Sequence, residues 1–214
     1  MYEDDYYEQY FELGKAIELN QKDKISVCAA GLYDEPDSPL RRNGDTALHV
    51  AAENGNSEIF MVIWKQILTS PHVKNSTGEL PFHYACREGA LGVIKIYVQE
   101  MKVSVDLKTP VGWTGLFYAA FNNQIPVVEY LISKKAHING VDKFYRSPLH
   151  WAAKYGFVEV LKRLVEAGGD LDFKDKEGVT ARQIINNWED KEIRPKIESI
   201  FALVKKKGEK KVIS

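Results

Sequence analysis

Histidine is the residue type in this chain best suited to general acid–base catalysis or to metal binding, and the chain has five of them. Three of these, His49, His83 and His150, are separated by 34 and then by 67 residues. The second separation is about twice the first, as expected for a repeat in which one copy lacks the histidine. If each copy is one packed structural unit, neighbouring rings lie roughly 10 Å apart, too far to share a metal ion. We therefore predict that these three histidines are structural. His72 and His137 are expected in loops.

Other patterns that could carry chemistry are incomplete. The acidic run 170–178 resembles a calcium-binding loop, but that motif needs an oxygen ligand at Lys174 and a glycine at Asp175. The sequence has no phosphate-binding glycine loop, nucleophile elbow or His-Glu-x-x-His motif. Its two cysteines, Cys28 and Cys86, lack Cys-x-x-Cys spacing, so we expect buried thiols in a reducing compartment. The chain is predicted not to be an enzyme and to use no cofactor or metal.

The histidines belong to a repeat that is marked by glycine. Gly44, Gly78, Gly112 and Gly178 lie 34, 34 and 66 residues apart, and the position that breaks the series is Tyr145. Similar segments follow these positions: DTALHVAA, ELPFHYAC, WTGLFYAA and RSPLHWAA, with a degenerate copy over residues 179–186. After each of the four clear copies comes a second apolar stretch, which predicts a second helix packed between adjacent copies.

This pattern resembles the ankyrin repeat, whose hallmark Thr-Pro-Leu-His-x-Ala begins the first of two antiparallel helices. The resemblance covers residues 42–186. It implies an all-α ankyrin-repeat solenoid of stacked helix pairs with β-turn fingers, with about six repeat units including degenerate caps. It also implies that His49 and His150 form hydrogen bonds with the hydroxyl groups of Thr46 and Ser147.

The ends of a repeat array must turn polar faces to water, so they should differ from the middle. We expect an N-terminal capping helix pair and turn at residues 1–41, four ankyrin repeats at 42–174 and a C-terminal capping repeat at 175–204. A basic flexible tail follows at residues 205–214. This tail is a solvated terminus in the simplest interpretation, and nuclear import or an anionic partner is the alternative.

The composition and net charge of the chain limit the classes of partner that it can bind. With 214 residues, 44% hydrophobic and 28% charged, the chain can form a real core, and its net charge of −1 offers no field for nucleic acid or an anionic membrane. Residues 1–8 are acidic, unlike a targeting segment, and the longest apolar run, Ile59–Trp64, is too short to span a membrane. We expect a cytoplasmic protein, with the nucleus also open, that binds no nucleic acid or membrane and is a monomer by itself.

In the ankyrin resemblance, partners bind the concave side, which is formed by the finger tips and the ends of the first helices. The first two copies have polar residues there, including Asp45, Glu53 and Glu88. In later copies these positions become aromatic and basic, which are the residue types that anchor interfaces. The predicted partner-binding residues are Trp113, Phe121, Phe144, Arg146, Lys154, Tyr155 and Trp188. The alternative is that these rings fold back onto a neighbouring finger or cap.

The sequence thus predicts a non-catalytic protein-interaction module, an adaptor or scaffold with a protein partner in its concave groove. Two alternatives stay open: an assembly chaperone or inhibitor that masks a partner's surface, and a regulatory or targeting part of a larger enzyme or ligase complex. Asn139 matches the loop asparagine that asparaginyl hydroxylases modify in many ankyrin proteins, although most such residues only form the loop. The N-terminal tyrosines are expected in a cap surface or acidic arm rather than in a phosphorylation cluster.

Overall fold

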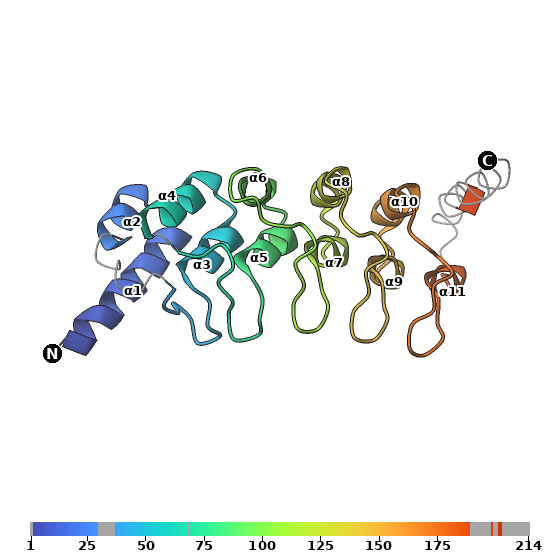
Figure 1. Cartoon of the computed structure of the whole chain (residues 1–214), viewed down its shortest axis with the longest axis horizontal. Helices are drawn as coiled ribbons and strands as arrows, with labels where there is room; N and C mark the ends of the chain where they lie inside the picture. Colours follow the sequence, from blue (N-terminus) through green and yellow to red (C-terminus); the bar gives the residue numbers. More distant parts are fainter. Residues whose placement is uncertain (1, 30–36, 68, 189–197, 199–200, 203–214) are drawn as a thin grey trace. The chain divides into compact units, whose positions relative to one another are not determined.

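The structure is a computed structural model that describes residues 2–29, 37–67, 69–188, 198 and 201–202 (Figure 1). Within these residues the chain is helical, and its β contacts are two isolated bridges, Pro39–Thr46 and Lys174–Thr180. None of the described helices is both long enough and apolar enough to cross a membrane. The chain divides into two compact units, Met1–Pro110 and Val111–Ser214.

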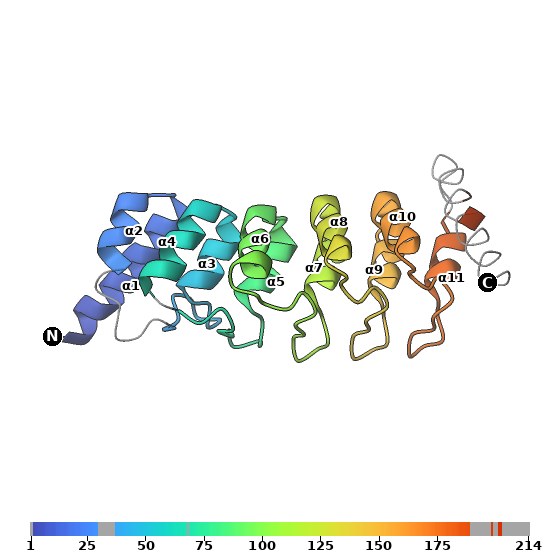
Figure 2. The same cartoon turned by 45° about the horizontal axis from the view of Figure 1, so that its top comes forward.

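The first unit contains three helix pairs. They are α1 (Tyr2–Glu18) with α2 (Lys22–Ala29), α3 (Ala47–Asn54) with α4 (Ser57–Ile67), and α5 (Pro81–Glu88) with α6 (Leu91–Gln99). Within a pair the two helices pack on each other, and α1, α3 and α5 lie in one row while α2, α4 and α6 lie in another (Figures 1 and 2). Most of the turn expected before the first clear repeat falls on residues 30–36, outside the described residues.

The second unit repeats this arrangement. Its helices are α7 (Gly115–Phe121) with α8 (Ile125–Ser133), α9 (Pro148–Lys154) with α10 (Val158–Glu166), and α11 (Ala181–Asn186). Helix α9 packs between α7 and α11, and finger loops precede α9 and α11 (Figure 2). Most of the predicted C-terminal capping repeat beyond residue 188, and all of the tail at 205–214, lie outside the described residues.

Packing in both units depends on the small and apolar residues of the repeat. The alanines at one motif position have no exposed surface; they are Ala51, Ala85, Ala119 and Ala152. Because alanine has no long side chain, neighbouring first helices can approach closely. The second helices bury apolar residues of the predicted stretches, among them Phe60, Ile94, Val128 and Leu161. The core therefore lies between adjacent helix pairs, and no pair would be stable alone.

The motif histidines contact the residue that begins each first helix. Nδ1 of His49 lies 3.0 Å from Oγ1 of Thr46 and accepts a hydrogen bond of 3.2 Å from the Thr46 backbone N–H. Nδ1 of His150 lies 2.9 Å from the hydroxyl oxygen of Ser147 and 3.1 Å from its backbone nitrogen. These contacts confirm the two hydrogen bonds that the ankyrin resemblance implies.

The second ring nitrogen of each histidine faces a carbonyl oxygen of the following finger. The carbonyls are those of Glu79 for His49, Leu107 for His83 and Val179 for His150, at 3.0, 3.0 and 3.2 Å. A neutral ring with its proton on Nε2 satisfies both contacts, because Nδ1 then accepts and Nε2 donates. Both nitrogens are occupied within the fold, which supports a structural role over a metal or catalytic one.

We expect these rings to make the fold less stable below neutral pH. Burial lowers the pKa of His49, His83 and His150, although the carbonyl contacts partly oppose that shift. The unfolded chain then takes up protons at a higher pH than the folded chain does. The free energy of unfolding should therefore decrease as the pH falls through about 6.5. Urea denaturation followed by circular dichroism at a series of pH values measures this decrease.

The degenerate copy supplies a control for that experiment. There Oε1 of Gln183 accepts a 2.9 Å hydrogen bond from the Thr180 backbone N–H, so an amide takes the place of Nδ1. Changing all three buried histidines to glutamine should preserve this contact and flatten the pH dependence. If the variant loses stability with falling pH as steeply as the natural chain, another group is responsible.

Candidate functional site

Four aromatic rings meet in the second unit, on and beside α7 and α9. This aromatic cluster consists of Trp113, Phe121, Trp151 and Tyr155. The ring centroid of Phe121 lies 5.1 Å from that of Trp151 and 5.2 Å from that of Tyr155. The Trp113 centroid lies 5.3 Å from Phe121 and 5.7 Å from Trp151. These separations are in the favourable range for tilted and edge-to-face pairs, so two repeats together build one ordered aromatic surface.

The rings of the cluster differ in exposure. Tyr155 is 46% exposed, whereas Trp151 is buried and Trp113 and Phe121 are half-buried. Trp113 stacks against the buried ring of Phe117, with centroids 5.8 Å apart. Trp113 and Phe121 are therefore only partly open to a partner, because each is partly covered by its neighbours. Trp113 and Phe121 pack beneath the surface, and Tyr155 is the ring of the cluster that solvent reaches most.

Arg146 connects this cluster to the finger before α9, which we call the fourth finger (residues 140–147). Its guanidinium carbon lies 4.5 Å from the ring centroid of Phe144 and 4.4 Å from that of Trp151. Oδ2 of the buried Asp142 lies 3.1 Å from Nε and 3.0 Å from Nη2 of Arg146. Stacking on two rings and an ion pair at one edge hold the guanidinium in a single orientation.

Three lysines surround the same two rings. The Nζ atoms of Lys143 and Lys176 lie 5.2 and 6.0 Å from the Phe144 centroid, and that of Lys154 lies 5.1 Å from the Trp151 centroid. A pocket of about 350 Å³ opens here, and the residues that line it include Phe144, Arg146, Trp151, Lys154, Lys176 and Glu177. We define the fourth-finger surface as Lys143, Phe144, Tyr145, Arg146, Lys154, Tyr155 and Lys176.

Tyr145 has an unusual backbone for its residue type. The corresponding residue in the other fingers is a glycine with φ between 77° and 88°, and Tyr145 has φ of 60°. This left-handed conformation costs roughly 1–2 kcal/mol for a residue with a Cβ atom. The side chain is nevertheless 51% exposed, so packing within the fold does not account for it. Strained residues of this kind are often found at functional sites.

Backbone hydrogen bonds between fingers fix this surface further. The N–H of Lys143 donates to the carbonyl of Val111, and the N–H of Lys176 donates to the carbonyl of Phe144, both at 3.0 Å. Each finger tip is therefore attached to the preceding one within the second unit.

Of the seven predicted site residues, the structure brings six together. Trp188 is half-buried, and no ring contact joins it to the aromatic cluster within the described residues. The prediction missed Tyr145, Trp151 and Lys176. The interruption of the glycine series marked Tyr145, whereas no sequence signal placed Lys176 beside Phe144, 32 positions earlier.

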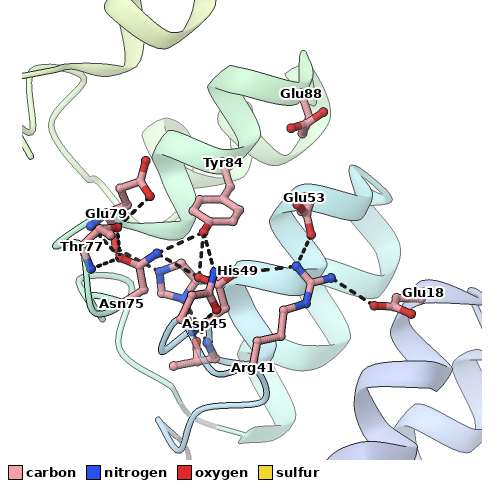
Figure 3. Close-up of polar contacts among 12 residues, drawn as sticks. Glu18, Arg41, Asp45, His49, Glu53, Asn75, Thr77, Glu79, Tyr84 and Glu88 are labelled. Atoms are coloured by element: carbon pink, nitrogen blue, oxygen red, sulfur yellow. Dashed lines mark hydrogen bonds and ion pairs between the residues drawn. The ribbon is translucent and has the colours of Figure 1, made fainter.

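The predicted polar positions in the first unit form a different kind of surface (Figure 3). Asp45 is completely buried rather than solvated. Its carboxylate accepts hydrogen bonds from the Tyr84 hydroxyl at 2.8 Å, the Asn75 amide at 2.9 Å and the Asn43 amide at 2.8 Å. Asp45 therefore does not belong to the accessible polar residues of the concave side, because residues of the next finger and helix cover it.

The arginines of this surface have carboxylate partners. Arg41 forms ion pairs with Glu18 and Glu53 (Figure 3). Arg87 forms ion pairs with Glu53 and Glu88. Neither guanidinium is therefore left without a carboxylate partner.

Comparisons with known proteins agree with the repeat. The family model for ankyrin repeats in three copies matches residues 13–108, 63–142 and 91–175. The chain is 35% identical over 100 residues to the palmitoyltransferase AKR1 of Lachancea kluyveri, covering 45% of this chain and 14% of that protein. It is 30% identical over 149 residues to the neurogenic locus notch homolog protein 1 of Homo sapiens, covering 68% of this chain and 6% of that protein.

The notch homolog protein 1 of Danio rerio is 31% identical over 175 residues, which is 79% of this chain and 7% of that protein. The chain thus spans 14% or less of the length of these three relatives. Together the three ranges matched by the family model run from residue 13 to residue 175, which includes helices α2 to α10. The chain belongs to the ankyrin repeat family.

Proposed function

We propose that the chain is a non-catalytic adaptor or scaffold that holds a protein partner against the fourth-finger surface, in the cytoplasm or the nucleus. Ankyrin repeats are protein-interaction modules, and the family model supports this general role. The observation that carries the more specific proposal is Tyr145, an exposed ring in a left-handed conformation where the other fingers turn at glycine.

The neighbours of Tyr145 make the proposal energetically reasonable. Phe144 and Tyr155 are 45% and 46% exposed, so a partner could bury a large part of each ring. Aromatic residues and arginine account for much of the binding energy in protein interfaces. Because the aromatic cluster and the finger hydrogen bonds already hold these side chains in place, binding would cost little additional conformational entropy.

Tyr145→Gly separates binding from folding. Glycine relieves the backbone strain, so the free energy of unfolding should rise by about 0.5–1 kcal/mol after the entropy cost of glycine is subtracted. Loss of the ring should at the same time weaken partner binding. Urea denaturation gives the stability. Calorimetric titration with a partner captured from a lysate of the source cells gives the affinity.

Tyr155→Ala is the second variant, with an expected loss of about 2 kcal/mol in binding. Phe11→Ala is the matched control, because Phe11 is an aromatic residue of the first unit that is 68% exposed. Trp113→Ala is unsuitable since its ring packs on the buried Phe117. Unchanged affinity in folded Tyr145→Gly and Tyr155→Ala proteins would refute the assignment of this surface.

A regulatory segment of a larger enzyme is the second candidate. The observation that favours it is the similarity to a palmitoyltransferase of which the matched region makes up 14%. An immunoblot of source cells with an antibody against this chain distinguishes the two candidates. A band near 24.3 kDa supports the adaptor, and a much larger band supports the regulatory segment.

A further inference from the structure

We infer that the partner segment held by the fourth-finger surface is an acidic peptide, whose carboxylates contact Arg146, Lys154 and Lys176 while its apolar side chains cover Phe144 and Tyr155. This inference rests on the proposed function and adds the chemistry of the partner.

The lysines of this surface are not neutralised by carboxylates within the described residues. Within the described residues, Lys143, Lys154 and Lys176 have no carboxylate at ion-pair distance, and their ammonium groups lie over aromatic rings. A ring attracts a cation without cancelling its charge, so each ammonium group keeps its capacity to bind an anion. Arg41 and Arg87 of the first unit, by contrast, are paired with glutamates.

The guanidinium group of Arg146 is held in a fixed orientation. Asp142 occupies its Nε and Nη2, and within the described part of the chain Nη1 has no hydrogen-bond partner. The guanidinium is stacked between Phe144 and Trp151, so Nη1 is held in place before a ligand arrives. A fixed guanidinium edge is well suited to a carboxylate oxygen.

The nearby aspartates already accept hydrogen bonds within the fold. Oδ1 of Asp142 accepts from the backbone N–H groups of Phe144 and Arg146, and Oδ1 of Asp175 accepts from those of Glu177 and Val179. Of the acidic residues that line the pocket, Glu177 is the exposed one. Lys143, Arg146, Lys154 and Lys176 therefore outnumber the nearby carboxylates of Asp142, Asp175 and Glu177, although the whole chain has a net charge of −1.

A peptide fits these features better than a nucleic acid does. The cations gather around two rings and one pocket of about 350 Å³, which is large enough for a few side chains. Nucleic-acid surfaces need an extended row of cations that follows successive phosphates. The exposed rings of Phe144 and Tyr155 provide apolar contacts that a partner peptide can match with its own side chains.

The test is a selection from a phage-displayed library of random dodecapeptides against the full chain. We expect the enriched peptides to combine Asp or Glu with apolar residues. For an enriched peptide, fluorescence anisotropy should show at least tenfold weaker binding once its acidic residues are changed to the corresponding amides, and weaker binding at high salt. The Lys154→Gln/Lys176→Gln protein should show a similar loss. The matched control is Lys65→Gln/Lys95→Gln, two exposed lysines of the first unit.

Each outcome bears on the inference. Enriched peptides that are neutral or basic, yet lose binding to Tyr155→Ala, would overturn the acidic partner and leave the proposed function standing. Selection of peptides indifferent to Tyr155→Ala, or of none, would overturn both. Tight binding of a fluorescent oligouridylate that requires Lys154 and Lys176 would replace the peptide with RNA.

Discussion

Leu149→Ala should lower the free energy of unfolding by about 2–5 kcal/mol, because the substitution leaves a cavity between packed helices. Leu149 has no exposed surface, and a Cβ atom added at Gly169 would lie 2.7 Å from its Cδ1, which shows how tightly the side chain is enclosed. Urea denaturation followed by circular dichroism gives the value.

The control for this change is Leu19→Ala in the first unit. Leu19 is 56% exposed, so its truncation removes few contacts and should cost well under 1 kcal/mol. A loss below about 1 kcal/mol for Leu149→Ala as well would mean that the repeat register is wrong.

Asp45→Ala should also have a large effect and lower the free energy of unfolding by about 2–4 kcal/mol. The substitution removes the acceptor of the buried Tyr84 hydroxyl and one of the two acceptors of the Asn75 amide, which still contacts the Tyr84 oxygen. The Tyr84 hydroxyl would then donate to nothing in a site closed to water. Burial alone would raise the pKa of Asp45, but the hydrogen bonds from Asn75, Asn43 and Tyr84 outweigh it and lower the pKa. The unfolded carboxyl therefore takes up its proton first, and this part of the stability is lost as the pH falls below about 4.

Equilibrium denaturation of Asp45→Ala, Asp45→Asn, Tyr84→Phe and Asp45→Ala/Tyr84→Phe tests this assignment. Asp45→Asn keeps one acceptor oxygen and should cost less than Asp45→Ala. The double variant Asp45→Ala/Tyr84→Phe should recover part of the loss, because it also removes the stranded hydroxyl. Strictly additive losses would indicate that Asp45 and Tyr84 do not stabilise each other.

The repeat itself could be predicted from the sequence because its signals are local. Each Leu–His–x–Ala segment lies within one turn or two of its cap, so the positions of the first helices followed from the motif. The hydrogen bonds of His49 and His150 to Thr46 and Ser147 span three residues, and the sequence contains both partners. Periodicity of this kind determines which face of a helix is buried.

Contacts between repeats were harder to predict, since they join residues about 30 positions apart. Asp45 looks like a surface charge until Asn75 and Tyr84 are placed over it. In the same way, Trp113 looks exposed until Phe121 and Trp151 are placed beside it. The motif determines the backbone of each copy. The side-chain contacts between repeats depend instead on residues of the neighbouring repeat.

The central claim is that a protein partner binds the fourth-finger surface, and site-specific photo-crosslinking in source cells tests it even while the partner is unidentified. A photoreactive phenylalanine analogue is placed at Phe144, and in a second protein at Glu129, an exposed residue of α8 outside that surface. We predict a crosslinked protein at position 144 that disappears when Tyr155→Ala is added, and none at position 129. A crosslinked protein at position 129 with none at position 144 would contradict the account.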